Sequence, residues 1–172
     1  CEALPDGLRA IVATPENEGV LELPLMGRFN LDNALSAIAT LYGLGYSLDS
    51  LWQAASRLQP VPGRMQRLPG AADGDGPVVV VDYAHTPDAL ENALSALRAH
   101  LPSRKGGQLW CVFGCGGDRD SGKRPLMAAV AETLADRIVV TDDNPRSEDQ
   151  SRIRDQIVAG LSLSAKETAW SV

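Results

Sequence analysis

Histidine and cysteine are scarce in this chain. Among 172 residues there are two histidines and three cysteines, Cys1, Cys111 and Cys115. Cys111 and Cys115 with His85 and His100 could suggest a metal site, but the C-x-x-x-C spacing differs from the usual C-x-x-C of zinc sites. An odd number of cysteines, with two inside one strand-like stretch, does not form a disulfide framework. We therefore expect packed, reduced thiols, a cytoplasmic protein, and no metal site made from these residues.

The sequence also lacks a long apolar run and an excess of basic residues. No stretch approaches the roughly 18 apolar residues that a membrane-spanning helix needs, and no basic-then-apolar leader opens the chain. The net charge is −6, and Arg and Lys are scattered, which argues against a nucleic-acid partner. Because the overall field repels anions, any phosphate or carboxylate ligand must be held by local donors. We expect a soluble protein.

The first third of the chain predicts one strand and two helices. Residues 19–27 alternate like a strand, and residues 29–45 place apolar side chains at helical spacing. A second helix is expected over residues 47–58, with Ser47 as its cap. Residues 59–77 contain four prolines and four glycines, which interrupt any long element. A short strand could still form within this stretch. This stretch predicts a domain boundary.

The remainder of the chain repeats a strand followed by a helix three times. The expected strands are residues 77–85, 108–114 and 137–142, and the expected helices are residues 86–101, 123–135 and 147–161. The β-branched run of the first strand is typical of a strand buried on both faces. Successive units of this kind predict an α/β fold, a Rossmann-like open parallel sheet with flanking helices. Ligands of such sheets bind beyond the carboxyl ends of the strands.

The loop after the second of these strands is rich in glycine and charge. Residues Gly117 to Lys123 satisfy G-x-x-x-x-G-K, the pattern of a phosphate-binding loop. Position 124, however, is Arg, where that motif needs a hydroxyl for magnesium. Two interpretations stay open: a glycine-rich turn with a charged tip, or an anion-binding loop in which Arg119, Lys123 and Arg124 each could meet a carboxylate or phosphate.

Two further stretches allow both a structural and a nucleotide-binding interpretation. Asp82 ends the first of the three strands, where a carboxylate either caps a helix or accepts hydrogen bonds from a ribose. His85 follows, and a hydrogen-bonding or stacking role is favoured over that of a general base. Asn30 and Asn33 lie three residues apart at a helix start, where one is a cap or both face an adenine edge.

The loop after the third strand carries residues that suit a zwitterion. In T-D-D-N-P-R, Pro145 fixes its own backbone and keeps Asn144 out of the helical region. Asp143 and Arg146 are thereby presented on a stiff turn. A guanidinium group takes a carboxylate, whereas Asp and Asn take an ammonium group. The alternative is a polar turn in which Ser147 caps the next helix.

Five stretches in order resemble the Mur ligase family, ATP-dependent enzymes that add amino acids to the peptidoglycan precursor. They are GRFNLDNALSAIA, LQPVPGRMQ, VVVDYAHTPDAL, WCVFGCGGDRDSGKRPLM and VVTDDNPR. The resemblance covers most of residues 26–146. It implies that residues 1–62 are the end of a central ATP-binding domain and that residues 63–172 are most of the C-terminal domain.

The resemblance also implies roles for individual residues. The expected ATP-binding residues are Asn30, Asn33, Arg64, Asp82, Tyr83 and His85. The expected residues for meso-2,6-diaminopimelate are Arg119, Asp143, Asn144, Pro145 and Arg146, the last four matching a D-N-P-R motif that separates diaminopimelate-adding members from lysine-adding ones. No catalytic residue and no metal ligand is expected in this segment.

The family's reaction implies the remaining cofactors and partners. ATP phosphorylates the γ-carboxylate of a UDP-N-acetylmuramoyl dipeptide, Mg²⁺ assists, and the amine of diaminopimelate attacks the acyl phosphate. The family's phosphate loop, carbamylated lysine and last amino-acid-binding segment do not occur here, so this chain alone is expected to be inactive, and a monomer. The alternatives are a lysine-adding ligase, a folylpolyglutamate synthetase-like ligase, or a non-catalytic binding module.

Overall fold

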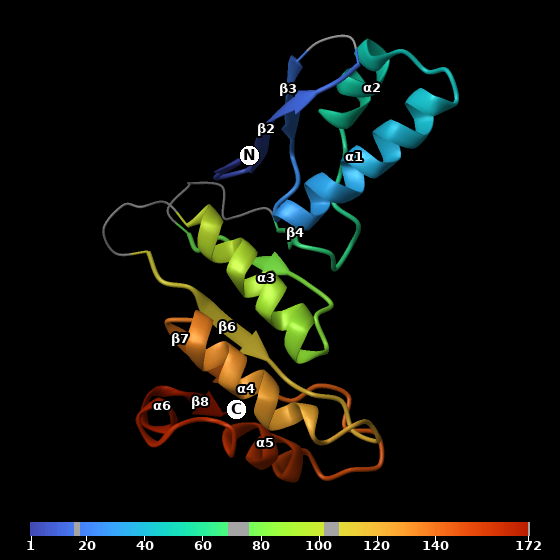
Figure 1. The fold of residues 1–172 in the computed structure, drawn as a ribbon. Helices are drawn as coiled ribbons and strands as arrows, with labels where there is room; N and C mark the ends of the chain where they lie inside the picture. Colours follow the sequence, from blue (N-terminus) through green and yellow to red (C-terminus); the bar gives the residue numbers. More distant parts are fainter. Residues whose placement is uncertain (16–17, 69–75, 102–106, 172) are drawn as a thin grey trace. The chain divides into compact units, whose positions relative to one another are not determined.

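The computed structural model describes residues 1–15, 18–68, 76–101 and 107–171 (Figure 1). The chain divides into two compact units, Cys1–Tyr83 and Ala84–Val172. The stretch 59–77, in which we predicted a boundary, precedes this division, and its residues 69–75 lie outside the described residues.

Among the described residues, the first unit contains a three-stranded antiparallel sheet with two helices, and a separate pair of short strands. The larger part consists of β1 (Glu2–Leu4), β2 (Gly7–Ala13), β3 (Glu18–Leu23), α1 (Arg28–Gly43) and α2 (Leu48–Ala55). The strand order is β1-β2-β3. The structure confirms the predicted strand, both predicted helices and the cap, since Ser47 Oγ accepts a hydrogen bond from Ser50 N at 3.4 Å. The sequence analysis did not predict β1 and β2.

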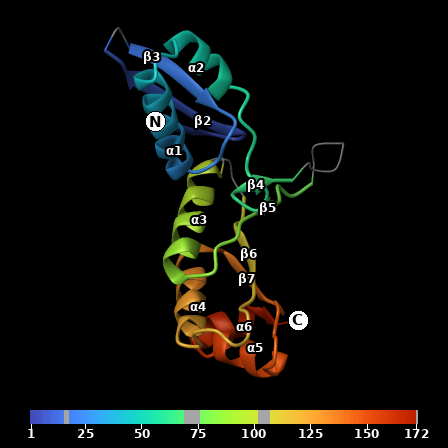
Figure 2. The same cartoon turned by 90° about the vertical axis from the view of Figure 1, so that its right-hand side faces the viewer.

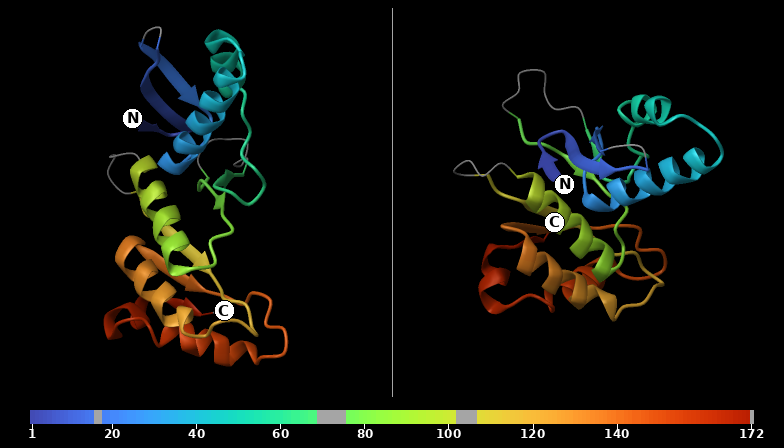
Figure 3. Two further views of the ribbon diagram at one scale, coloured as in Figure 1. Left: turned by 45° about the vertical axis from the view of Figure 1, so that its right-hand side comes forward. Right: turned by 45° about the horizontal axis from the view of Figure 1, so that its top comes forward.

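One face of this sheet and one side of α1 form the core of the first unit. Leu8 and Leu21 of the sheet pack with Leu31 and Ala34 of α1, and each is less than one-tenth exposed. Figure 3 shows α1 lying along the sheet in both views. Burial of alternate strand residues against a helix with apolar residues three and four apart is the usual way for such elements to remove apolar surface from water.

The strand predicted over residues 77–85 is wrong in its partner and its burial. Only β5 (Val80–Val81) is a strand, and it pairs antiparallel with β4 (Gln66–Arg67) instead of joining a parallel sheet. Val78, at 59% exposure, is not buried on either face. A β-branched run favours a strand but does not specify its partner. The antiparallel neighbour is close in sequence, and a smaller sequence separation costs less closure entropy.

The described part of the second unit contains a parallel sheet and four helices. Its strands are β6 (Trp110–Phe113), β7 (Arg137–Val140) and β8 (Trp170–Ser171). Its helices are α3 (Pro87–His100), α4 (Lys123–Leu134), α5 (Gln150–Val158) and α6 (Leu163–Thr168). The order β6-β7-β8 is parallel throughout, which confirms the α/β class. The third strand of this sheet is β8, which the sequence analysis missed along with α6.

Helices cover one face of the parallel sheet. Figure 2 shows α3 and α4 on the same side of β6 and β7. Cys111 and Phe113 face a buried cluster that includes Leu94 of α3, Met127 of α4 and Ile157 of α5. Both cysteines of this unit are buried and free, as predicted, and burial raises the pKa of the Cys111 thiol to about 12.

The other face of the sheet carries exposed apolar side chains. Trp110 and Val112 alternate with the buried residues of β6 and are 45% and 63% exposed. The ring centroids of Trp110 and Trp170 lie 5.1 Å apart, a distance typical of a tilted aromatic pair. This contact joins the first and last strands of the sheet across β7.

The start of α3 follows from its capping residues. Thr86 Oγ1 accepts a hydrogen bond from Ala89 N at 3.3 Å, and Pro87 occupies the first position of α3, as predicted.

Within the described ranges, no helix is long and apolar enough to cross a membrane.

Ile157→Ala tests the core of the second unit. Ile157 has an exposure of 0%, so truncation leaves a cavity, and we expect a loss of about 2–5 kcal/mol in the free energy of unfolding. Leu163→Ala, at a residue 82% exposed, is the matched control and should change it by less than about 0.5 kcal/mol. Chemical denaturation measures both, and equal losses would contradict the described core.

Candidate functional site

Two loops leave the carboxyl ends of β6 and β7 side by side. We call residues 114–122 and 141–149 the paired loops. Because β6 and β7 are parallel, with Phe113 opposite Val140, both loops begin at the same edge of the sheet. Gly117 N donates to Asn144 O at 2.9 Å. A Cβ atom on Gly117 would lie 1.8 Å from Pro145 O, so the two backbones can meet only where this residue is Gly.

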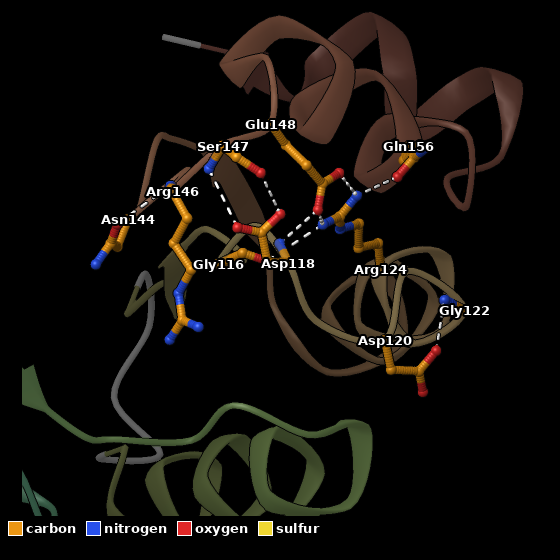
Figure 4. Close-up of polar contacts among 10 residues, drawn as sticks. All are labelled: Gly116, Asp118, Asp120, Gly122, Arg124, Asn144, Arg146, Ser147, Glu148 and Gln156. Atoms are coloured by element: carbon orange, nitrogen blue, oxygen red, sulfur yellow. Dashed lines mark hydrogen bonds and ion pairs between the residues drawn. The ribbon is translucent and has the colours of Figure 1, made fainter.

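A buried arginine holds the paired loops and α5 together. Arg124, the second residue of α4, has an exposure of 0%. Its Nη1 donates to Glu148 Oε2 at 2.9 Å and also to Gln156 Oε1. Its Nη2 donates to Glu148 Oε1 at 2.8 Å and to Gly116 O at 3.2 Å. One guanidinium group thereby contacts both loops and α5 (Figure 4), and its bidentate pairing with a carboxylate fixes direction as well as distance.

The carboxylates of Glu148 and Asp118 connect the loops a second time. Asp118 N donates to Glu148 Oε1 at 2.6 Å, and the Asp118 carboxylate accepts from Ser147 Oγ at 2.6 Å. The hydrogen bonds from Arg124 lower the pKa of Glu148 from 4.5 to about 2, and those from Ser147 lower the pKa of Asp118. Both groups are therefore held as carboxylates at neutral pH.

The residues predicted to bind the amino acid lie at the open tips of the paired loops. Arg119, Asp143, Asn144 and Arg146 are exposed, and Asn144 Oδ1 accepts a hydrogen bond from Arg146 N at 3.2 Å. Figure 4 shows the Arg146 side chain extending away from the Arg124 network. Within the described residues, neither the Arg119 nor the Arg146 guanidinium has an ion pair. The structure thus brings the predicted residues together with two guanidinium groups available to an anion.

Two of the candidate anion ligands have other partners. Arg124 faces the interior and pairs with Glu148, so the suggestion that it meets a ligand anion is wrong. Lys123 Nζ donates to His85 O at 2.7 Å, which ties the start of α4 to the loop before α3. The phosphate-loop-like pattern of residues 117–123 therefore serves to join loops, and only Arg119 of the three cations is directed outward.

The suggestion that Ser147 caps the following helix is also wrong. The cap of α5 is Asp149, whose Oδ1 accepts from Arg152 N at 3.0 Å. Ser147 instead bonds Asp118 across the paired loops. The hydrogen-bonding role of Asp118, Ser147 and Glu148 was missed, because a polar residue near a helix start looks the same in sequence whether it caps locally or bridges to another loop.

The residues predicted to bind ATP are distributed over both units. Asn30 and Asn33 both lie in α1, where Asn30 Nδ2 donates to Met26 O at 2.7 Å and Asn33 is exposed. The N-cap position of α1 is Gly27, with no side-chain cap, so neither asparagine is the cap that the structural interpretation required. His85 belongs to the second unit.

The other three predicted ATP residues are close together in the first unit. The Asp82 carboxylate accepts from Met65 N at 2.9 Å. The guanidinium carbon of Arg64 lies 5.5 Å from the centroid of the Tyr83 ring, within the range of a cation–π interaction. Tyr83 N donates to Gly63 O at 2.7 Å. This arrangement presents an exposed arginine and an exposed aromatic ring beside each other.

The acidic side chains of the described residues are not gathered into a metal-binding cluster. No group of three or more His, Cys, Asp or Glu side chains among them could hold a metal ion. The Asp82 carboxylate, one of the predicted nucleotide-binding groups, bonds a backbone amide.

Sequence comparison identifies the family of the second unit and of the segment before it. Residues 63–171 match the family model described as "Mur ligase, glutamate ligase domain". The chain belongs to the Mur ligase family. The site at the tips of the paired loops is therefore a feature of a Mur ligase domain.

Curated relatives specify the resemblance further. The chain is 60% identical over 156 residues to UDP-N-acetylmuramoyl-L-alanyl-D-glutamate–2,6-diaminopimelate ligase of Pseudomonas putida, covering 91% of this chain and 30% of that protein. It is 56% identical over 162 residues to the protein of the same name in Pseudomonas aeruginosa, covering 94% and 32%. The chain spans about a third of the length of the curated relatives it matches.

Solved structures of other Mur ligases are similar in fold. One structure of a UDP-N-acetylmuramoyl-L-alanyl-D-glutamate–2,6-diaminopimelate ligase matches with a TM-score of 0.68 and 36% identity, over 99% of this chain and 33% of that one. Folylpolyglutamate synthase from Thermotoga maritima matches with a TM-score of 0.74 and 21% identity, over 99% and 38%. The second likeness concerns the fold alone.

Acid titration tests the role of Glu148. Its pKa is lowered in the folded chain, so its contribution to stability is fully present above pH 4.5 and is lost as the pH falls through about 2. We expect the difference in free energy of unfolding between the wild type and Glu148→Gln to shrink over this interval. Denaturant unfolding at a series of pH values measures it, and a constant difference from pH 7 to pH 2 would contradict the Arg124–Glu148 pair.

Proposed function

We propose that this chain is the amino-acid-binding part of an ATP-dependent ligase that adds meso-2,6-diaminopimelate to UDP-N-acetylmuramoyl-L-alanyl-D-glutamate. The observation that supports this most directly is the pair of exposed arginines, Arg119 and Arg146, on neighbouring loops at one sheet edge. The names of the relatives at 56–60% identity agree with it. In this proposal, residues 1–62 end a central ATP-binding domain and residues 63–172 form most of the C-terminal domain.

The chemistry of the loop tips suits the far end of diaminopimelate. That end is a zwitterion with one carboxylate and one ammonium group. Arg119 and Arg146 offer planar donors for the carboxylate, while Asp143 and Asn144 offer oxygen acceptors for the ammonium group. Pro145 keeps the turn between them stiff. Holding this end leaves the other amine of the substrate free to react.

These residues serve the second half of the proposed reaction. ATP phosphorylates the D-Glu γ-carboxylate and ADP leaves; the diaminopimelate amine then attacks the acyl carbon, and phosphate departs. This chain's contribution is to orient the attacking amine, which reduces the entropy lost in reaching the transition state. Asn30, Asn33, Arg64, Asp82, Tyr83 and His85 are the proposed ATP-binding residues, and Mg²⁺ would be held by other parts of the ligase. A cytoplasmic monomer is the proposed state.

The same loop tips provide selectivity against lysine. Lysine lacks the second carboxylate, so its binding would leave a desolvated arginine unpaired at a cost of roughly 2–5 kcal/mol. A lysine-adding ligase or a folylpolyglutamate synthetase-like ligase would not need this pair of arginines. A non-catalytic binding module remains the alternative from another class, and a longer parent protein without an upstream G-K-[ST] phosphate loop would favour it.

Arg146→Ala in the intact ligase that carries this chain tests the proposal. We expect the KM for diaminopimelate to rise by about thirtyfold or more, since a charge-assisted pair is lost, with the KM for ATP within about twofold of wild type. Preference for diaminopimelate over lysine should narrow in a competition assay.

Arg137→Ala is the matched control for this experiment. Arg137 is an exposed arginine at the opposite end of β7, and its Nη1 bonds only the neighbouring Asp136 O at 2.9 Å among the described residues. It should leave both KM values unchanged. Equal increases in KM for diaminopimelate and ATP in Arg146→Ala would disprove the assigned role.

A further inference from the structure

Two residues, one in the predicted amino-acid site and one next to it, have an unusual backbone conformation. Asp118 and Arg146 both have φ of 52°, in the left-handed region that side chains with a Cβ atom rarely adopt. Asp tolerates this region better than Arg does. A strained arginine at the tip of a loop persists only when its neighbours fix it. Contacts from neighbouring residues must therefore hold Arg146 in this conformation.

The contacts that fix both residues come from one reciprocal set of hydrogen bonds. The Asp118 carboxylate accepts from Ser147 N at 3.2 Å and from Ser147 Oγ at 2.6 Å. In return, Asp118 N donates to Glu148 Oε1 at 2.6 Å. Asp118 directly precedes Arg119, and Ser147 directly follows Arg146. Each predicted substrate arginine is therefore one peptide bond away from the same bridge.

The bridge also determines which partner the Arg146 charge has. Asp118 is close enough to Arg146 for that arginine to contribute to its lowered pKa, yet the larger contribution comes from Ser147. Because both Asp118 oxygens accept from Ser147, the carboxylate is turned toward the serine and makes no salt bridge with Arg146 among the described residues. The arginine stays available for an external carboxylate.

The base of the bridge is rigid. Glu148 is held by two hydrogen bonds from the fully buried Arg124, at 2.9 and 2.8 Å. The backbones of the loops meet at Gly117, 2.9 Å from Asn144 O. Asp118 thus links the Arg124–Glu148 pair to Ser147, the residue that follows Arg146.

We propose that Asp118 is a positioning residue for the amino-acid site: by binding Ser147 it fixes the separation of Arg119 and Arg146 and keeps Arg146 unpaired. This role rests on the proposed function, because it supposes that the two arginines receive the distal carboxylate of the incoming amino acid. Asp118 itself does not touch the substrate.

Asp118→Gly in the intact ligase is the main test, because glycine adopts φ of 52° without strain and its substitution removes the side chain that binds Ser147. We expect the KM for diaminopimelate to rise by about ten- to a hundredfold, with the KM for ATP within about twofold. Asp118→Asn keeps an oxygen acceptor and tolerates the left-handed region, so its KM for diaminopimelate should lie between those of the wild type and Asp118→Gly. Hydrogen exchange of the 141–149 segment should quicken in Asp118→Gly.

Glu132→Ala is the matched control, because alanine removes the acceptor. Glu132 Oε2 accepts from Ser162 N at 2.8 Å, also across about thirty residues of sequence, but it joins α4 to the segment before α6 and not the paired loops. This variant should leave both KM values unchanged. It separates the effect of losing any such bridge from the effect of losing this one.

The outcomes are distinguishable. An unchanged KM for diaminopimelate in Asp118→Gly, equal rises in KM for diaminopimelate and ATP, or a lowered melting temperature alone would overturn the positioning role while the proposed function stands. A wild-type ligase that does not use diaminopimelate overturns both. If Asp118→Gly fails to fold, Asp118→Asn decides by the same comparison.

Discussion

The ion pair between Arg124 and Glu148 is the constraint on which the site depends. A guanidinium group with no exposure must recover in hydrogen bonds what it loses in hydration. Arg124 does so with acceptors from three segments, Gly116, Glu148 and Gln156. Only its Nε has no partner among the described residues. Because these acceptors must converge on one planar group, the two loops and α5 have a single compatible arrangement.

The arginines of this region divide into two kinds with different consequences. Arg124 is buried and fully committed to protein acceptors, so it contributes order and no binding capacity. Arg119 and Arg146 are exposed and have no carboxylate of their own within the described residues. In a chain of net charge −6, such cations attract an anion only at short range. Local geometry therefore has to supply what the overall charge does not.

Much of this arrangement could be predicted from the sequence. The helical periodicity of α2, α3 and α4, the caps of α2 and α3, and the parallel pairing of β6 and β7 placed Arg119 and the D-N-P-R turn at one edge. The partner of β5 could not be predicted, because a β-branched run favours a strand but does not specify which strand pairs with it. The burial of Arg124 was missed for a similar reason. A cation beside a glycine-rich loop has the same local pattern whether it points outward or inward, and only the distant Glu148 and Gln156 decide.

The meeting of the backbones at Gly117 limits how such a site can diverge. Any side chain at this position would collide with Pro145 O, and a change in the length of either loop would move the other. Residues at the base of the site can therefore change only together. The exposed side chains of Arg119 and Asp143 are under no such limit, since they take no part in the contact at Gly117. Replacements at these two positions can therefore change the charge presented at this edge of the sheet while the backbone contact below it is kept.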